Sequence, residues 1–228
     1  MCIRDSISII NLGLLLKAKG DLAATEPLYR EALEVQREIL GNRHPETLLS
    51  INNLGLLLKA KGDLAAAEPL LREALEGWRG TLGNRHLDAL TSINNLGLLL
   101  QAKGDLAAAE PLYREALEGM RETLGNRHPD TLTSMNNLGD LMYAKGNLAA
   151  AESLLREVLE LQRETLGSGH PDTLCSIGDL SMLLIRRKLG STYNYIASMC
   201  HSPQLTWWPR APGDRLLPAK LSVPLIAR

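Results

Sequence analysis

Four histidines are the residues whose type and spacing first suggest chemistry. Their positions are 44, 86, 128 and 170, which are 42 residues apart at each step. Imidazole nitrogens bind zinc at about 2.0 to 2.1 Å. A constant interval indicates one histidine per structural unit, and packed helices lie roughly 10 Å apart. Side chains so separated do not meet at one ion, so we expect no metal site.

The third histidine begins the tripeptide His128-Pro129-Asp130, which also occurs in the ATPase-stimulating loop of chaperone J domains. Related tripeptides stand at 44–46 (HPE), 86–88 (HLD) and 170–172 (HPD). A dedicated functional loop would not recur once per unit, so we interpret the tripeptide as a linker. Its proline presets the first helical turn and its acid faces the positive end of the helix.

Other chemistry-bearing patterns are missing from the sequence. There is no glycine-rich phosphate loop, no Ser/His/Asp or Cys/His nucleophile set, and no carboxylate pair in a predicted pocket. The three cysteines are odd in number and include no C-x-x-C pair, which indicates neither a disulfide framework nor a zinc site. We therefore predict a protein that is not an enzyme and needs no cofactor, with reduced thiols as in an intracellular protein.

The overall charge and hydropathy exclude further classes of partner. The formal net charge is −1 for 228 residues, which gives no reason to expect binding to nucleic acid or to an anionic membrane. No stretch reaches the 18 or more apolar residues of a membrane span. We predict a soluble, cytoplasmic protein.

The elements that position these residues repeat with the same period. In one unit, Leu48, Ile51, Leu54 and Leu58 recur at steps of three and four, which predicts one apolar face of a helix. Gly62-Asp63 then predicts a tight turn, in which glycine ends the first helix and aspartate caps the second. A single hairpin of this kind cannot bury both apolar faces, so the units must stack.

The second helix of each unit also carries an acid and an arginine four residues apart, outside the apolar stripe. The pairs are Glu26/Arg30, Glu68/Arg72, Glu110/Arg114 and Glu152/Arg156. Such a pair contributes only about 0.2 to 0.5 kcal/mol, so packing between units must provide most of the stability.

The small and apolar residues at 54, 55, 58, 67, 71 and 74 resemble the tetratricopeptide consensus. The 42-residue unit, with its LGNRHPDTL linker, is similar to the repeat domain of kinesin light chain. The resemblance implies an all-α, right-handed superhelical solenoid of antiparallel helix hairpins. It also implies a non-catalytic protein-interaction scaffold that binds extended peptides in the concave groove lined by the first helices, as the cargo-binding repeats of kinesin light chain do. Motor association has no support, because no heptad coiled coil precedes the repeats.

The resemblance directs attention to asparagines on the first helices. An asparagine offers an acceptor and two donors, which suits it to binding a peptide backbone. The alternative is that these asparagines cap or cross-link neighbouring helices. The candidate peptide-binding asparagines are Asn11, Asn52, Asn53, Asn94, Asn95, Asn136 and Asn137.

One turn further on, the residues differ from unit to unit, as specificity positions would. They are Lys17, Lys59, Gln101 and Tyr143. The two lysines favour an acidic segment in the ligand. Leucines at 14, 56 and 98, with Asp140 in the fourth unit, are candidates for apolar pockets.

The repeat pattern fails at both ends. We expect a non-repeat segment at 1–7, four repeats plus one extra helix at 8–187, and a disordered tail at 188–228 that is rich in proline. Apolar terminal helices without a polar outer face suggest a second hypothesis, in which the chain is a self-associating solenoid fragment of a larger signalling protein.

Overall fold

The computed structural model describes residues 9–200 except 11, 14, 17 and 18. It describes the burial of side chains only as far as residue 190. Contacts divide the chain into two units, Met1–Ile185 and Arg186–Arg228. The first unit contains the repeats. The described residues form helices and no strands, as the sequence predicts.

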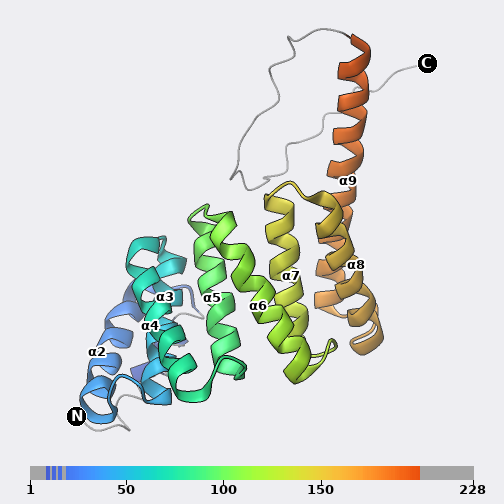
Figure 1. Cartoon of the computed structure of the whole chain (residues 1–228). Coiled ribbons are helices and arrows are strands. Elements are labelled where there is room, and N and C mark those ends of the chain that lie inside the picture. The colour runs from blue at the N-terminus through green and yellow to red at the C-terminus, as the bar shows by residue number, and fades with distance from the viewer. Residues whose placement is uncertain (1–8, 11, 14, 17–18, 201–228) are drawn as a thin grey trace. The chain divides into compact units, whose positions relative to one another are not determined.

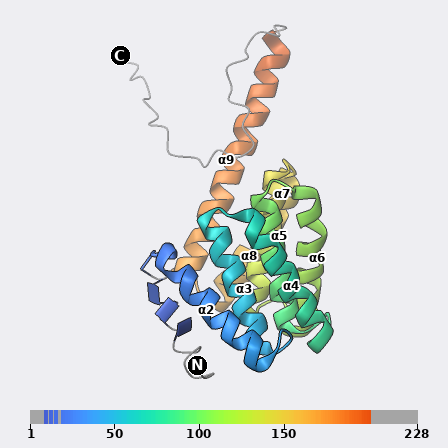
Figure 2. The ribbon, with the colours of Figure 1, turned by 90° about the vertical axis from the view of Figure 1, so that its left-hand side faces the viewer.

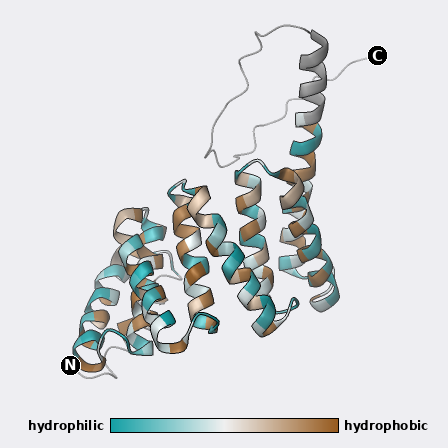
Figure 3. Cartoon of the chain, viewed as in Figure 1, coloured by the Kyte–Doolittle hydropathy of each residue, from teal (hydrophilic) through white to brown (hydrophobic). Residues whose placement is uncertain are grey.

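The helices follow one another in chain order (Figures 1 and 2). Their bounds are α2 Leu22–Leu40, α3 Pro45–Lys61, α4 Leu64–Leu82, α5 Leu87–Ala102, α6 Leu106–Leu124, α7 Pro129–Ala144, α8 Leu148–Thr165 and α9 Pro171–Cys200. Each helix from α3 to α7 packs mainly against the helices before and after it in sequence, while α2 packs on α3 and α8 on α7. The result is a stack of hairpins whose buried apolar side chains form one core. Figure 3 shows hydrophobic and hydrophilic residues interspersed along each helix.

The tight turn within each hairpin has the predicted chemistry. Gly62 has φ 87° and ψ 0°, a left-handed conformation that only glycine adopts at little cost. Asp63 then caps α4, because its carboxylate accepts a hydrogen bond from the amide of Ala66 at 3.1 Å. The same cap is formed by Asp21, Asp105 and Asn147 in the other units.

The linker between hairpins ends in the histidine that starts the next first helix. His44, His86 and His128 are the N-caps of α3, α5 and α7, and each Nδ1 accepts from the amide two residues ahead. In the last of these, the amide of Asp130 lies 3.2 Å from Nδ1 of His128. The linker interpretation of the histidines is therefore confirmed.

Small residues allow the two helices of a hairpin to approach closely. A Cβ added to Gly97 of α5 would lie 2.7 Å from Cε1 of Tyr113 in α6, closer than atoms can pack. Ala109 and Ala116 on the same helix as Tyr113 are fully buried. Bulkier residues at these positions would separate the helices of the hairpin.

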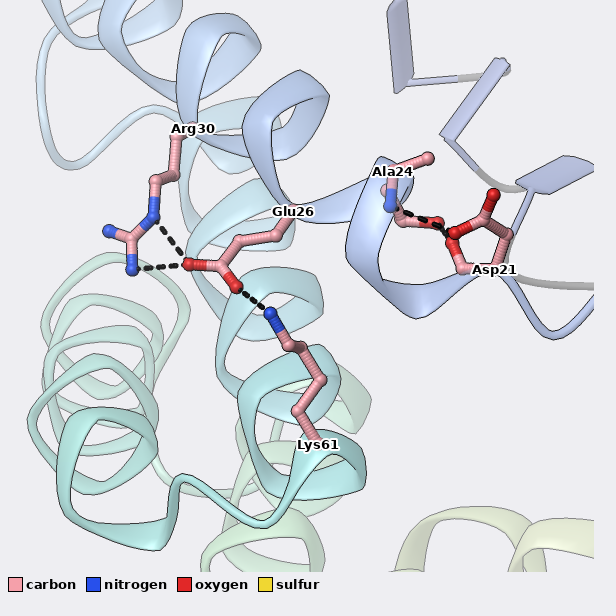
Figure 4. Close-up of polar contacts among 6 residues, drawn as sticks. Asp21, Ala24, Glu26, Arg30 and Lys61 are labelled. Carbon is pink, nitrogen blue, oxygen red and sulfur yellow. Dashed lines mark hydrogen bonds and ion pairs between the residues drawn. The ribbon is translucent and has the colours of Figure 1, made fainter.

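Charged clusters join consecutive units outside the core. In Figure 4, Glu26 of α2 binds Arg30 one turn along its own helix, at 2.8 Å, and also Lys61 at the end of α3. The equivalent clusters are Glu68/Arg72/Lys103 and Glu110/Arg114/Lys145. We call these three groups the ion-pair clusters. The lysine in each comes from the following unit, so the clusters fasten one unit to the next.

A second series of ion pairs links successive second helices. Arg37 binds Glu73 at 2.7 Å, and the same pair recurs as Arg79/Glu115 and Arg121/Glu157. A third series joins linkers to second helices, as Arg85/Glu122 and Arg127/Glu164. In the first unit Arg43 faces Gly80 at the equivalent position, so the third series begins only with Arg85.

Helix α9 starts as a fifth first helix but does not end at the expected turn. Leu180 and Leu183 are buried in the core, as their equivalents in α3, α5 and α7 are. The helix then continues to Cys200, past residue 188, where we expected a disordered tail to begin. The rest of that segment, residues 201–228, lies outside the described residues, as do residues 1–7.

Candidate functional site

The candidate binding residues that the structure describes lie on one face of the first helices. On α3 this face contains Asn52, Asn53 and Leu56, which are all half-buried. The steps of three and four place them on one side of the helix. The equivalent residues are Asn94, Asn95 and Leu98 on α5, Asn136, Asn137 and Asp140 on α7, and Asp179 on α9. We call this set the asparagine face. Asn11 and Lys17 lie outside the described residues.

Some of these asparagines bind one another across neighbouring units. The side-chain amide of Asn95 donates to Oδ1 of Asn52 at 3.0 Å, linking α5 to α3. The hydroxyl of Ser134 in α7 donates to Oδ1 of Asn94 at 3.3 Å. Asn94 is itself only 6% exposed. Asn94 therefore connects helices within the stack, whereas the Asn52 amide nitrogen has no protein acceptor among the described residues.

Two asparagines keep their side chains uncommitted. Neither Asn53 nor Asn137 forms a side-chain hydrogen bond among the described residues, and both are half-buried. Asn53 lies beside Ile10, Tyr29 and Ser50, and no space large enough for a ligand atom opens between them. The Tyr29 hydroxyl is buried and has no partner among the residues that the structure describes. Among the described asparagines of this face, Asn53 and Asn137 are thus the two whose side chains form no hydrogen bond and are not fully buried.

The varied positions one turn further on differ in their surroundings. Burial lowers the pKa of the Lys59 ammonium, because it loses hydration, and no described residue forms an ion pair with it. Gln101 already accepts a hydrogen bond from the Tyr113 hydroxyl at 3.0 Å. Tyr143 packs against the core and is half-buried. Of the three, Lys59 alone carries a formal charge, and it forms no ion pair among the described residues.

The last part of the asparagine face is acidic. Asp140 is solvent-exposed, yet protein atoms around it limit its hydration and the nearby Asp179 carboxylate adds repulsion, which together raise the pKa of Asp140 to about 6. Limited hydration also raises the pKa of Asp179. Neither carboxylate forms an ion pair among the described residues. Sequence reasoning assigned Asp140 only to a varied apolar pocket and did not consider Asp179, although the 42-residue period aligns it with Asn137.

The described residues offer little for metal binding or membrane insertion. They contain no group of three or more His, Cys, Asp or Glu side chains that could hold an ion. None of the described helices combines the length and apolar character needed to cross a bilayer.

Comparison with known proteins places these features in a family. The tetratricopeptide repeat profile matches residues 5–80, 49–122 and 88–164. No curated protein matches the chain.

Several solved structures have the same fold. Two contain the nearly identical tetratricopeptide-like repeats of a Podospora anserina protein described as a kinesin light chain. One superposes with a TM-score of 0.71 at 25% identity, covering 88% of this chain and 99% of the other. A variant of those repeats with one substitution gives 0.70 at 25% identity, with 86% and 96% covered.

A third similar structure is BtubC (BKLC) from P. vanneervenii, with a TM-score of 0.68 at 22% identity, covering 92% of this chain and 85% of the other. The matched residues span more than half of the chain. They include the hairpins, helix caps and small-residue contacts of this chain that are described above. The chain therefore belongs to the tetratricopeptide repeat family, and its repeats are of the kinesin light chain-like type.

Proposed function

We propose that the chain is a non-catalytic scaffold that binds extended peptide segments along the asparagine face. The observation that carries this proposal is the hydrogen-bonding capacity of Asn53 and Asn137, whose half-buried side chains form no hydrogen bond among the described residues. An unpaired amide bonds a peptide backbone whatever its side chains are. Leu56 and Leu98, half-buried beside the asparagines, supply apolar contact area.

The spacing of the face also fits an extended ligand. Successive first helices stand about 10 Å apart, and an extended chain advances about 3.3 Å per residue. One unit therefore corresponds to about three ligand residues, and Asn53 and Asn137 are two units apart. A segment of roughly six or more extended residues would reach both.

The experiment is a selection from a random 12-residue peptide display library on the immobilised full chain. The affinity of a selected peptide would then be measured for the wild type and for the double variant Asn53→Ala/Asn137→Ala. Each lost hydrogen bond contributes about 0.5 to 1.5 kcal/mol, so we expect affinity to fall about fivefold to a hundredfold.

A matched control is available in the linkers. Asn42 and Asn126 are exposed and lie in the linkers, outside the first helices, so Asn42→Ala/Asn126→Ala should leave the affinity unchanged. Equal affinity of all three proteins would remove Asn53 and Asn137 from the site. Failure to select any peptide would contradict the peptide-binding function.

An acidic ligand segment near Lys59 and a cytoplasmic location stay predictions.

Self-association is a second candidate, favoured by one observation. Leu12 and Leu15 are 49% and 63% exposed, whereas their equivalents Leu54 and Leu57 are 1% and 0% exposed. A second copy covering these leucines would remove apolar area from water. Sedimentation velocity at several concentrations tests this candidate, and a monomer at the highest concentration would contradict it.

A further inference from the structure

One side of α9 is exposed where the other first helices are buried. Leu174 is 55% exposed, whereas the leucines one, two and three periods earlier are 4%, 0% and 1% exposed. Ser181 is exposed, and Ile177 and Leu184 are half-buried, although the equivalent residues of α3, α5 and α7 are all buried. Steps of three and four place these four residues on one side of the helix. We call them the uncovered side of α9.

In the preceding hairpins, the second helix of the same unit covers this side. Leu48 of α3, the equivalent of Leu174, packs so closely on Gly77 of α4 that no Cβ would fit between them. Leu90 of α5 and Gly119 of α6 repeat the contact. In the described part of the chain no second helix follows α9, because α9 continues where the Gly-Asp turn would stand.

The opposite side of α9 is packed in the stack. Leu180 and Leu183 are 8% and 0% exposed, and Thr173 and Ser176 are 0% and 1% exposed. The leucines have buried equivalents in α3, α5 and α7. This part of α9 is therefore held as a first helix, and a helix that covered its other side would remove apolar surface from water.

Ser181 indicates what kind of helix fits. Its hydroxyl donates to the carbonyl of Ile177 at 2.7 Å, so it needs no partner from a ligand. The equivalent residue of α7 is Gly139, and a Cβ added there would lie 3.5 Å from Cδ2 of Leu155 in α8, an ordinary contact. The equivalent Cβ in α5 would lie only 2.7 Å from a tyrosine ring. A leucine therefore fits opposite Ser181 better than a tyrosine.

We propose that the uncovered side of α9 binds an amphipathic helix of a partner protein. The partner helix lies antiparallel to α9, as a second helix does in each hairpin, and places a leucine opposite Ser181. An alanine one turn before that leucine, like the fully buried Ala151 of α8, allows the two helices to approach closely. The contact continues the series of interfaces between first and second helices. It does not depend on peptide binding along the asparagine face.

The experiment uses a synthetic peptide of residues 147–167, which contains α8 with its capping Asn147 and has no proline inside the helix. Fluorescence anisotropy of the labelled peptide measures its binding to the full chain. We expect saturable binding to the wild type. Binding to Leu174→Asp should be about tenfold to a hundredfold weaker, because a leucine is no longer buried. Leu155→Asp in the peptide should have an effect of similar size.

Two substitutions at Ser181 separate helix packing from unspecific apolar adhesion. Ser181→Ala keeps the side chain small and should leave the affinity unchanged. Ser181→Phe adds apolar surface but fills the space of the partner's leucine, so binding should weaken about tenfold. As a matched control, Leu49→Asp changes a leucine of α3 that is 47% exposed and should leave the affinity unchanged. Circular dichroism would check that each variant is folded.

Four outcomes would overturn the proposal. They are no binding to the wild type, equal affinity for the wild type and Leu174→Asp, tighter binding to Ser181→Phe than to the wild type, and dimers that vanish in Leu174→Asp while no peptide binds. The last result, from sedimentation velocity, would assign the uncovered side to a second copy of the chain. Asn53→Ala/Asn137→Ala should bind the helix like the wild type, so this proposal and the proposed function can fail separately.

Discussion

The ion-pair clusters and the asparagine face use the same repeat in opposite ways. In each cluster one glutamate is shared by an arginine of its own helix and a lysine of the next unit, and the residue types are identical in all three clusters. On the asparagine face the residue types change along the stack, and several donors and acceptors are left unpaired among the described residues. Repetition with complete pairing indicates a structural role, whereas change with incomplete pairing is the reason why we propose a ligand site on the asparagine face.

The largest expected difference is between two neighbouring leucines of α5. Leu99 is 0% exposed in the core and Leu98 is half-buried beside the asparagines. We expect Leu99→Ala to lower the free energy of unfolding by about 2 to 5 kcal/mol, and Leu98→Ala by about 1 kcal/mol or less. Urea denaturation followed by circular dichroism measures both. Equal losses would show that the asparagine face is as much a part of the core as the buried face.

A glycine at one repeated position tests how tightly each hairpin is packed. A Cβ on Gly97 would lie 2.7 Å from the Tyr113 ring, but on Gly139 it would lie 3.5 Å from Leu155. Gly97→Ala should therefore cost about 1 to 3 kcal/mol through overpacking. Gly139→Ala should add up to about 1 kcal/mol through helix propensity. Thermal unfolding of the two variants should shift in opposite directions, and a shared direction would contradict the packing difference.

Gly80 stands where the third series of ion pairs has a glutamate, so a substitution at Gly80 can add one more ion pair to that series. Arg85 and Arg127 bind Glu122 and Glu164, while Arg43 lies at an ordinary contact distance from a Cβ added to Gly80. Gly80→Glu should raise the free energy of unfolding by about 1 kcal/mol from helix propensity, with a few tenths more from the exposed ion pair. Gly80→Ala is the control for propensity alone. If added salt does not reduce the difference between the two variants, the ion pair has not formed.

The smallest effect is a pH dependence of opposite sign in the two regions. Hydrogen bonds from Lys103 and then Arg72 lower the pKa of Glu68, so its contribution is present above the unfolded value of about 4.3 and is lost on acidification. Asp140 has a pKa raised to about 6 in the folded chain. Between about pH 4 and pH 6 the folded state binds the extra proton, so stability falls as pH rises through this window.

Melting temperatures at several pH values between 4 and 7 measure this contrast. Asp140→Asn should remove the decrease that Asp140 causes on raising the pH. Glu68→Gln should instead remove part of the loss on acidification. Parallel pH curves for the wild type and Asp140→Asn would contradict the raised pKa of that carboxyl.

Sequence reasoning succeeded where the determining contacts are local. The turn at Gly62-Asp63 and the helix start at His44 depend on residues a few positions apart, so their types alone predicted them. The apolar stripe of α3 correctly predicted the burial of Leu48, Leu54 and Leu58, but it did not include Leu57, which is 0% exposed. The extension of α9 past residue 188 was not predicted, because no turn signal follows and the helix simply continues.

Contacts between units were harder to predict. Lys61 at the end of α3 binds Glu26, 35 positions earlier in the sequence. The hydrogen bond from Asn95 to Asn52 spans 43 positions. Such pairs depend on how units stack, which no single unit encodes. The signal that could have revealed Asp179 was the repeat period itself, which aligns it with the asparagines.

The nearest-neighbour packing of α2 to α8 has a mechanical consequence. Because each hairpin is held mainly by the units before and after it, a pull along the stack is transmitted through all the interfaces in series, and the softest one yields first. Within the described stack, the interface where Arg43 faces Gly80 lacks an ion pair that the later interfaces possess. When the array is pulled from its two ends, we expect the interface between Arg43 and Gly80 to separate before the interfaces that contain Arg85 and Arg127.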